Sequence, residues 1–165
     1  MAQRRPGPDI GKTQFDELEV ADLSDFRAWL SENHALAETL WLIRWLKTDE
    51  TVADGRYMPI LDIIDELLCF GWVDSVIAKR DAASSYVRIS QRNPKSAWSK
   101  VNKDKVARLE TEGRMTNAGR ALIETAKACG MWDFLNDVDE GIVPDDLANA
   151  LKAEQTSHAE TRQNL

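Results

Sequence analysis

The sequence predicts an α+β domain: a small, mostly antiparallel three-stranded sheet packed with about five helices. Two observations support this prediction. The runs that favour strands are few and short, and the longer stretches between them have helical periodicity without the regular strand and helix alternation of a doubly wound fold. With 165 residues, the chain fits one domain with one core. We expect a flexible leader at residues 1–14, a single domain over residues 15–153 and a polar tail at 154–165.

Helices are predicted where apolar residues recur at i, i+3 and i+4 between a capping residue and a glycine or polar stop. The predicted helices cover residues 24–33, 59–71, 97–111 and 116–130, with a short last helix after Pro144. In these segments Ser24, Ser96 and Thr116 are the expected N-caps, and Gly71 ends the second helix.

Three segments read as strands. Residues 41–46 are apolar at nearly every position, interrupted only by Arg44, which is typical of a central strand covered on both faces. Residues 72–78 and 86–91 are rich in strand-forming residues, and the turn at 81–84 between them predicts a hairpin.

The apolar residues of this hairpin select a register, because partners across two strands share a face. Pairing Ile77 with Val87 and Ser75 with Ile89 brings the aliphatic side chains together. The other face would then hold Trp72, Asp74, Val76, Tyr86, Arg88, Ser90 and Arg92.

Two interpretations of that polar face remain open. Asp74 could form a structural ion-pair cluster with Arg88 and Arg92. Alternatively, the two arginines form a fork for a phosphate or carboxylate, oriented by Asp74, with Trp72 or Tyr86 as a stacking wall.

The helix over residues 97–111 adds polar candidates to this ligand site. Asn102 falls on the apolar face with Trp98, where a buried amide needs partners; it either ties the helix to a neighbouring backbone segment or faces a ligand. Ser96 as N-cap would place free helix N–H groups near an anion at Arg92, and Ser99 fits either role.

Charge is unevenly distributed along the chain. Residues 79–108 contain nine basic side chains against two acidic ones, although the whole chain has a net charge of −7. This basic strip could hold an anion, contact nucleic acid or dock against the acidic remainder, and the overall charge disfavours nucleic acid. No apolar stretch approaches the length of a membrane helix, so we expect a cytoplasmic protein without membrane insertion.

The sequence assigns no catalytic residues, no cofactor and no metal site. The two histidines, His34 and His158, are far apart, and the two cysteines lack zinc-ligand spacing. The carboxylates Asp62, Asp65 and Glu66 are expected on a solvated helix face. Phosphate-loop, dinucleotide-binding and nucleophile-elbow patterns are missing from the sequence.

Several spaced motifs occur in one order between Phe26 and Leu151. They are Trp41-Leu42-Ile43, Leu68 to Ser75, Arg92, Ser96-Ala97-Trp98-Ser99, Asn102, Leu109, Gly113-Arg114-Met115, Ala118-Gly119, Gly130-Met131-Trp132 and Pro144 to Leu147. In these motifs the chain resembles the YdeI/OmpD-associated family, also called bacteriocin-protection proteins.

The resemblance implies a bacterial protein linked to resistance against bacteriocins or antimicrobial peptides, and it carries over no catalytic residues. The leading hypothesis is therefore a non-catalytic cytoplasmic protein that binds a protein or peptide partner in bacteriocin protection or envelope stress. The alternative is an enzyme or sensor for a small anionic ligand at Arg88 and Arg92. A third hypothesis is nucleic-acid binding along the basic strip.

Overall fold

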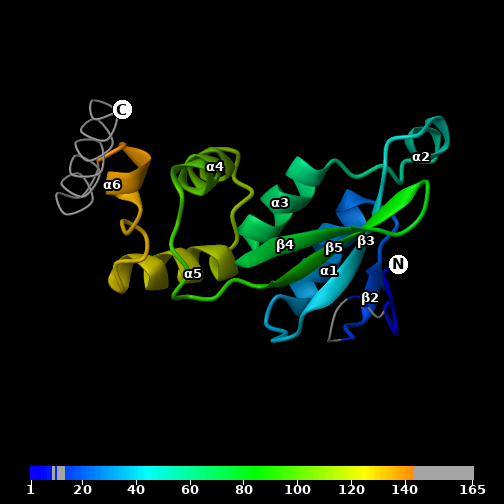
Figure 1. Cartoon of the computed structure of the whole chain (residues 1–165), viewed down its shortest axis with the longest axis horizontal. Helices are drawn as coiled ribbons and strands as arrows, with labels where there is room; N and C mark the ends of the chain where they lie inside the picture. Colours follow the sequence, from blue (N-terminus) through cyan, green and yellow to red (C-terminus); the bar gives the residue numbers. More distant parts are fainter. Residues whose placement is uncertain (9, 11–13, 143–165) are drawn as a thin grey trace, which may run out of the picture.

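A five-stranded mixed sheet with six helices forms the described part of the chain in the computed structural model (Figure 1). The structure describes residues 1–8, 10 and 14–142. The strands are β1 (Gln3–Arg5), β2 (Glu17–Glu19), β3 (Leu40–Trp45), β4 (Trp72–Lys79) and β5 (Ser84–Gln91). The helices are α1 (Leu23–Asn33), α2 (Asp49–Ala53), α3 (Ile60–Cys69), α4 (Lys100–Thr111), α5 (Asn117–Ala128) and α6 (Asn136–Asp139).

The prediction of a three-stranded, mostly antiparallel sheet is wrong. The sheet has the order β1-β2-β3-β5-β4, and β2 runs parallel to β3 while the other pairs are antiparallel. The two additional strands have three residues each, and β1 lies within the segment expected to be a flexible leader. The predicted central position of β3 and the predicted hairpin of β4 and β5 are confirmed.

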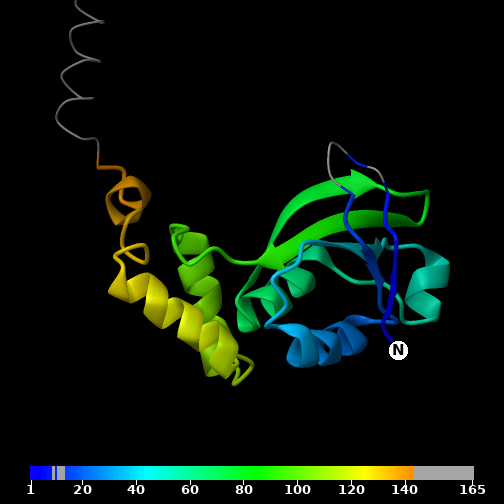
Figure 2. The ribbon, with the colours of Figure 1, turned by 90° about the horizontal axis from the view of Figure 1, so that it is seen from below.

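Each face of the sheet has its own cover. The helices α1 and α3 lie on one face, where Phe26, Leu30 and Leu67 join Leu42 and Val87 in the main core (Figure 2). On the other face, Trp41, Ile43 and Tyr86 form a smaller cluster with Phe15 and Ile10 from the chain between β1 and β2.

The helices α4, α5 and α6 lie beyond the end of the β4–β5 hairpin, away from β1 and β2 (Figures 1 and 2). They still share the main core, because Leu109 of α4 and Ile123 of α5 belong to the same buried cluster as Trp72. Trp98 packs on Trp132 with ring centroids 5.2 Å apart, which fastens the turn after α5 to the segment before α4.

The predicted register of the hairpin is confirmed at one end of the two strands and wrong at the other. Ile77 pairs with Val87 as predicted, but a bulge lies between Asp74 and Ile77, so that Asp74 faces Ile89 rather than Ser90. A shift of one residue moves a strand's side chains to the opposite face. The sequence pattern could not reveal the extra residue.

The helix caps differ from prediction at two of three positions. Asp22 rather than Ser24 caps α1, and Ser99 rather than Ser96 caps α4, whereas Thr116 caps α5 as predicted. Gly71 follows the end of α3 with a φ of 76°, the left-handed conformation that glycine adopts without strain.

Some predictions fall outside the described residues: the helix after Pro144, the polar tail at 154–165 and any role of His158. Among the residues that are described, no helix is both long and apolar enough to cross a lipid bilayer.

Candidate functional site

The bulge in β4 separates the predicted site residues onto two faces of the sheet. Trp72 and Asp74 pair with Gln91 and Ile89, on the face covered by α1 and α3. Tyr86 and Arg88 pair with Ile43 and Trp41 on the opposite face. The predicted arrangement, with all of these side chains on one face, is therefore wrong.

Tyr86 and Arg88 contact residues of the sheet and its flanking strand. The Tyr86 hydroxyl donates to Oε2 of Glu17 at 3.0 Å, and burial raises the pKa of Tyr86. Arg88 Nε donates to the Ser75 hydroxyl at 2.8 Å. These contacts favour a structural role for both residues.

Four other predicted residues do meet. Trp72, Asp74, Arg92 and Asn102 line a small cavity that α3 closes with Ile64, Leu67 and Leu68. Its volume of about 30 Å³ gives room for a water molecule, but not for a phosphate or a carboxylate ligand. An anionic ligand would therefore have to reach Arg92 from another side.

Arg92 is buried without a carboxylate partner among the described residues. Only 7% of its surface is exposed, and its Nη2 donates to the Ala97 carbonyl at 2.7 Å. Its guanidinium lies 4.1 Å from the centroid of the Trp98 ring, while Nε has no acceptor. Burial lowers the pKa of Arg92. Arginine side chains stay protonated in proteins, so the buried guanidinium carries a positive charge.

The turn before α4 holds the remaining candidates. Ser99 caps α4 by accepting from the Asn102 backbone at 3.4 Å, and Ser96 lies in the preceding turn, where its N–H donates to Asn93. Since Ser96 is not the N-cap, the predicted helix start beside Arg92 moves to Ser99. The half-buried Asn102 faces the small cavity described above.

The prediction of a solvated acidic face on α3 is wrong for Asp65 and Glu66, which are almost fully buried. Glu66 accepts from Arg27 at 2.5 Å and from Arg114 at 2.8 Å. Asp65 lies 2.6 Å from Arg108. Nothing near these carboxylates in the sequence signals the pairs, because the arginines come from α1, α4 and the turn between α4 and α5.

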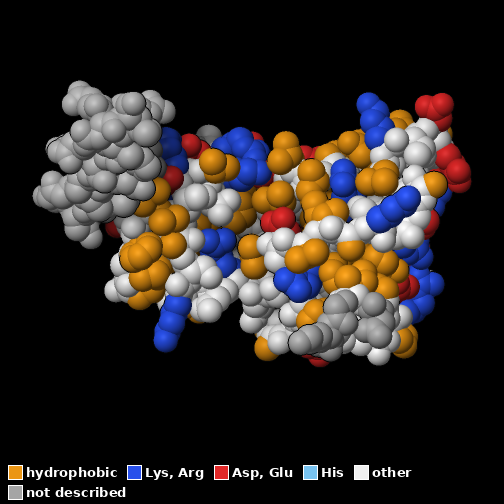
Figure 3. Space-filling model, viewed as in Figure 1, with side chains coloured by type: hydrophobic (Ala, Val, Ile, Leu, Met, Phe, Trp, Pro, Cys, Tyr) orange, Lys and Arg blue, Asp and Glu red, His pale blue; other side chains and the backbone are white. Residues whose placement is uncertain are grey.

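The basic strip at 79–108 does not form one surface. Four of its side chains pair with acidic residues: Arg80 with Asp81, Lys100 with Asp104, and Lys105 and Arg108 with Asp65. Figure 3 shows the Lys and Arg side chains of one face in separate groups, with apolar and acidic side chains between them. This part of the strip docks against the chain's own carboxylates.

A groove lies between α1 and α5, and we call it the α1–α5 groove. It has two adjoining parts, because His34, Phe70 and Ala118 line both of them. The Arg27 end has a volume of about 530 Å³ and the Arg92 end about 410 Å³. The Arg27 end is lined by Ser24, Arg27, Ala28, Ser31, His34, Phe70, Thr116, Asn117 and Ala118; the Arg92 end adds Ala35, Gly71, Gln91, Arg92, Pro94, Ala121, Leu122 and Thr125.

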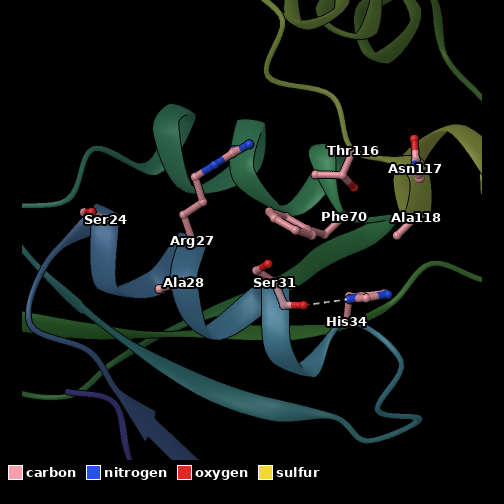
Figure 4. A pocket seen from close by; sticks show the side chains of 9 residues that line it. All are labelled: Ser24, Arg27, Ala28, Ser31, His34, Phe70, Thr116, Asn117 and Ala118. Atoms are coloured by element: carbon pink, nitrogen blue, oxygen red, sulfur yellow. Dashed lines mark hydrogen bonds between the residues drawn. The ribbon is translucent and has the colours of Figure 1, made fainter.

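The walls of the groove are two helix faces with small side chains. On α1, the groove is lined by Ser24, Ala28 and Ser31, which follow one another at intervals of about one turn. On α5, Ala118, Ala121 and Thr125 also follow one another at intervals of about one turn. Phe70 lies between α1 and the first residues of α5 (Figure 4). This spacing places one continuous side of each helix along the groove.

The groove is basic on an acidic protein. Arg27, His34 and Arg92 line it, and no aspartate or glutamate is among its described lining residues. The first turn of α5 opens onto the Arg27 end, and the N-terminus of a helix carries a partial positive charge. His34 Nδ1 is 3.1 Å from the Ser31 carbonyl, which leaves Nε2 free to face the groove (Figure 4).

Gly119 permits the close crossing that positions α5. A Cβ at this residue would lie 2.4 Å from the carbonyl oxygen of Cys69 at the end of α3. Thr116 donates its hydroxyl to the same oxygen at 2.6 Å. The start of α5 is thereby held against the end of α3, beside Phe70.

The geometry can be compared with known families. A family model described as a domain of unknown function, DUF8412, matches residues 18–122. The chain belongs to the DUF8412 family. No curated protein and no solved structure gives a significant match. The DUF8412 match includes α1, Phe70, Arg92 and the first half of α5, and thus most of the groove.

Metal binding finds no support in the part of the chain that the structure describes. No group of three or more histidine, cysteine, aspartate or glutamate side chains is placed to hold an ion there. Both cysteines are free thiols; Cys69 is buried and Cys129 is exposed.

Proposed function

We propose that this DUF8412 protein is a non-catalytic binding protein, and that the α1–α5 groove binds an acidic segment of a partner protein. The observation that carries the proposal is the charge of the groove: two arginines, Arg27 and Arg92, and no acidic side chain line it, on a chain of net charge −7. A cationic segment would be repelled there, whereas an acidic one is attracted.

The charge at the Arg92 end is the less compensated of the two. Arg27 already contacts Glu66 at 2.5 Å, so much of its charge is offset. Arg92 has no such carboxylate in the described structure, and His34 lies between the two ends. Attraction of an anion should therefore increase from the Arg27 end toward the Arg92 end.

The shape of the groove supports an extended occupant. Each end has the volume of an ordinary ligand site, and together they follow the sides of two helices. The small side chains of α1 and α5 allow a backbone to approach closely, while Phe70 and Leu122 offer apolar contact.

The biological role that we propose is bacteriocin or antimicrobial-peptide protection, or envelope stress, in the cytoplasm. It rests on the resemblance of the sequence motifs to YdeI/OmpD-associated proteins. Because the groove is basic, the bound segment would belong to an acidic partner rather than to a cationic antimicrobial peptide. The dispersed strip at 79–108 gives nucleic-acid binding no comparable support.

Two peptides of opposite charge and one charged variant of the groove test the proposal. We expect a hexaglutamate peptide to bind and to raise the melting temperature of the protein, and a hexalysine peptide to do neither. Ala121→Glu places an acidic side chain at an exposed groove position and should weaken hexaglutamate binding about tenfold or more. Calorimetric titration measures both affinities.

Ala107→Glu is the matched control, because Ala107 is exposed on α4 and away from the groove lining. It changes the net charge equally and should leave the affinity unchanged. Equal weakening by both variants, or equal binding of the two peptides, would show that the groove has no specific role.

A further inference from the structure

We infer that Arg92 is the anchor of the α1–α5 groove and receives one oxyanion, a carboxylate or a phosphate, at the Arg92 end. The inference rests on the proposed function, since it names the residue that would hold the acidic segment. It also goes further, because it assigns the strongest contact to a single guanidinium.

Arg92 differs in burial and in partners from three other arginines of the chain. Arg27, Arg108 and Arg114 are each about a third or more exposed, and each lies within 2.8 Å of a buried carboxylate. Arg92 is far more buried and contacts no carboxylate among the described residues. A buried charge without a partner is costly, so its retention points to a charge supplied from outside the chain.

The contacts around Arg92 hold its guanidinium in place before a ligand binds. The Arg92 N–H donates to the Gly71 carbonyl at 2.9 Å, which fixes the base of the side chain. The Trp98 ring and the Ala97 carbonyl hold its far end. Trp98 is itself fixed, because its N–H donates to Met131 and its ring packs on Trp132. A side chain ordered in advance loses little entropy when it binds.

The guanidinium of Arg92 has unused N–H donors, and the two hollows that Arg92 lines differ in size. A guanidinium has five N–H donors, and in the described structure only the bond to Ala97 uses them, with Nε left buried and unpaired. The inner cavity beside Asp74 and Asn102 is too small for an oxyanion. Arg92 also lines the Arg92 end of the groove, together with Gln91 and Pro94, and this hollow of about 410 Å³ has room for an oxyanion. We therefore assign the oxyanion to this end.

The decisive variant is Arg92→Met, which keeps the length of the side chain and removes the charge. If Arg92 is an anchor, Arg92→Met lowers the affinity for hexaglutamate about tenfold or more and leaves the ligand-free protein as stable as before, or more stable. If Arg92 only holds the fold, the variant unfolds at lower denaturant concentration and binds hexaglutamate as the unaltered chain does. That second result would overturn the inference.

Arg92→Lys separates charge from geometry. Lysine keeps the positive charge but lacks the planar fork and the stacking on Trp98, so we expect weakened binding here as well. Arg88→Met is the matched control, because Arg88 lies on the opposite face of the sheet. The affinity of this variant for hexaglutamate should equal that of the unaltered chain. An equal loss with Arg88→Met would contradict the inference.

The same titrations separate this inference from the proposed function. If Ala121→Glu weakens hexaglutamate binding and Arg92→Met does not, the groove binds acidic segments without this anchor and the inference fails alone. Inorganic phosphate serves as a second probe: if it binds in an Arg92-dependent manner and hexaglutamate does not bind, the anchor stands and the proposal of a peptide ligand fails.

Discussion

Glu66 illustrates how a single buried residue joins distant parts of this chain. Its two carboxylate oxygens accept hydrogen bonds from Arg27 of α1 and from Arg114 after α4. Arg27 also donates to the backbone carbonyl of Arg114 at 2.9 Å. One carboxylate on α3 therefore fixes α1 and the turn that leads into α5, the two walls of the groove.

We expect Glu66→Gln to lower the free energy of unfolding by about 2 kcal/mol. Removing one partner of a buried ion pair leaves its cations uncompensated, and the partial exposure of both arginines reduces the full cost. Urea unfolding measures the change.

Glu124→Gln is the control for this prediction. Glu124 is exposed and pairs with Lys127 on the surface of α5, so its substitution should change stability by no more than about 0.5 kcal/mol. Similar losses in the two variants would mean that the buried pairs contribute no more than surface ones.

Some site residues were predictable from the sequence and others were not. The strand register and the helical periodicity predict Arg92, Trp98 and Asn102 as site residues, and these residues do lie close together where the helix meets the sheet. The predicted register placed Arg88 on the same face as Arg92 because regular alternation was extended to residue 92, whereas β5 ends at Gln91 and Arg92 follows it. Phe70 falls within one of the motifs of the resemblance and His34 within none, but no pattern predicts that the two residues line one groove, since α1 and α3 meet there only through the fold.

At the level of elements, the crossing of α5 over the end of α3 depends on Gly119. The helix start is held there by Thr116, whose N–H and hydroxyl both donate to the Cys69 carbonyl. The separation of α5 from α1, and so the width of the groove, is set at this contact.

We expect Gly119→Ala to destabilise the protein by about 1 to 3 kcal/mol, although alanine favours a helix more than glycine does. The new methyl group would meet backbone atoms, which cannot move aside as a flexible side chain can. Thermal or urea unfolding measures the loss, and Asn117→Ala, an exposed substitution in the same helix, should not reproduce it. A stable Gly119→Ala variant would contradict the close crossing.

The longer elements were predictable because their patterns are strong. The apolar run of β3, the hairpin and the periodic helices α3 and α5 give clear signals over six to twelve residues. β1 and β2 have three residues each and no sustained alternation, so their pairing is determined by tertiary contacts. The additional residue in β4 likewise leaves no mark on composition or periodicity.

On the scale of the whole molecule, the folded unit extends beyond the family match. The DUF8412 match begins at residue 18, whereas β1 pairs with β2 from residue 3 onward. Gly7 is buried, and a Cβ there would collide with the Phe15 carbonyl. Residues 3–5 thus belong to the sheet, and Gly7 packs against the backbone of Phe15, which covers the second face.

Removal of residues 1–8 should therefore lower the free energy of unfolding by about 1 to 2 kcal/mol, because each lost backbone hydrogen bond contributes on the order of 1 kcal/mol. Arg4→Gln, which removes only exposed ion pairs with Asp16 and Glu38, is the control and should have a much smaller effect. If the shortened chain unfolds like the full one, the stable unit starts near residue 18 instead.

The bulge in β4 also bears on how the protein behaves at high concentration. β4 is an outer strand of the sheet, and its exposed Val76 and Ile77 would invite another chain to add a strand. The bulge lies between Asp74 and Ile77, at Ser75 and Val76, where such an irregularity bends a strand, and the exposed Lys79 adds charge near the end of β4. The irregularity that divided the predicted site thereby also protects the sheet from aggregation along its edge.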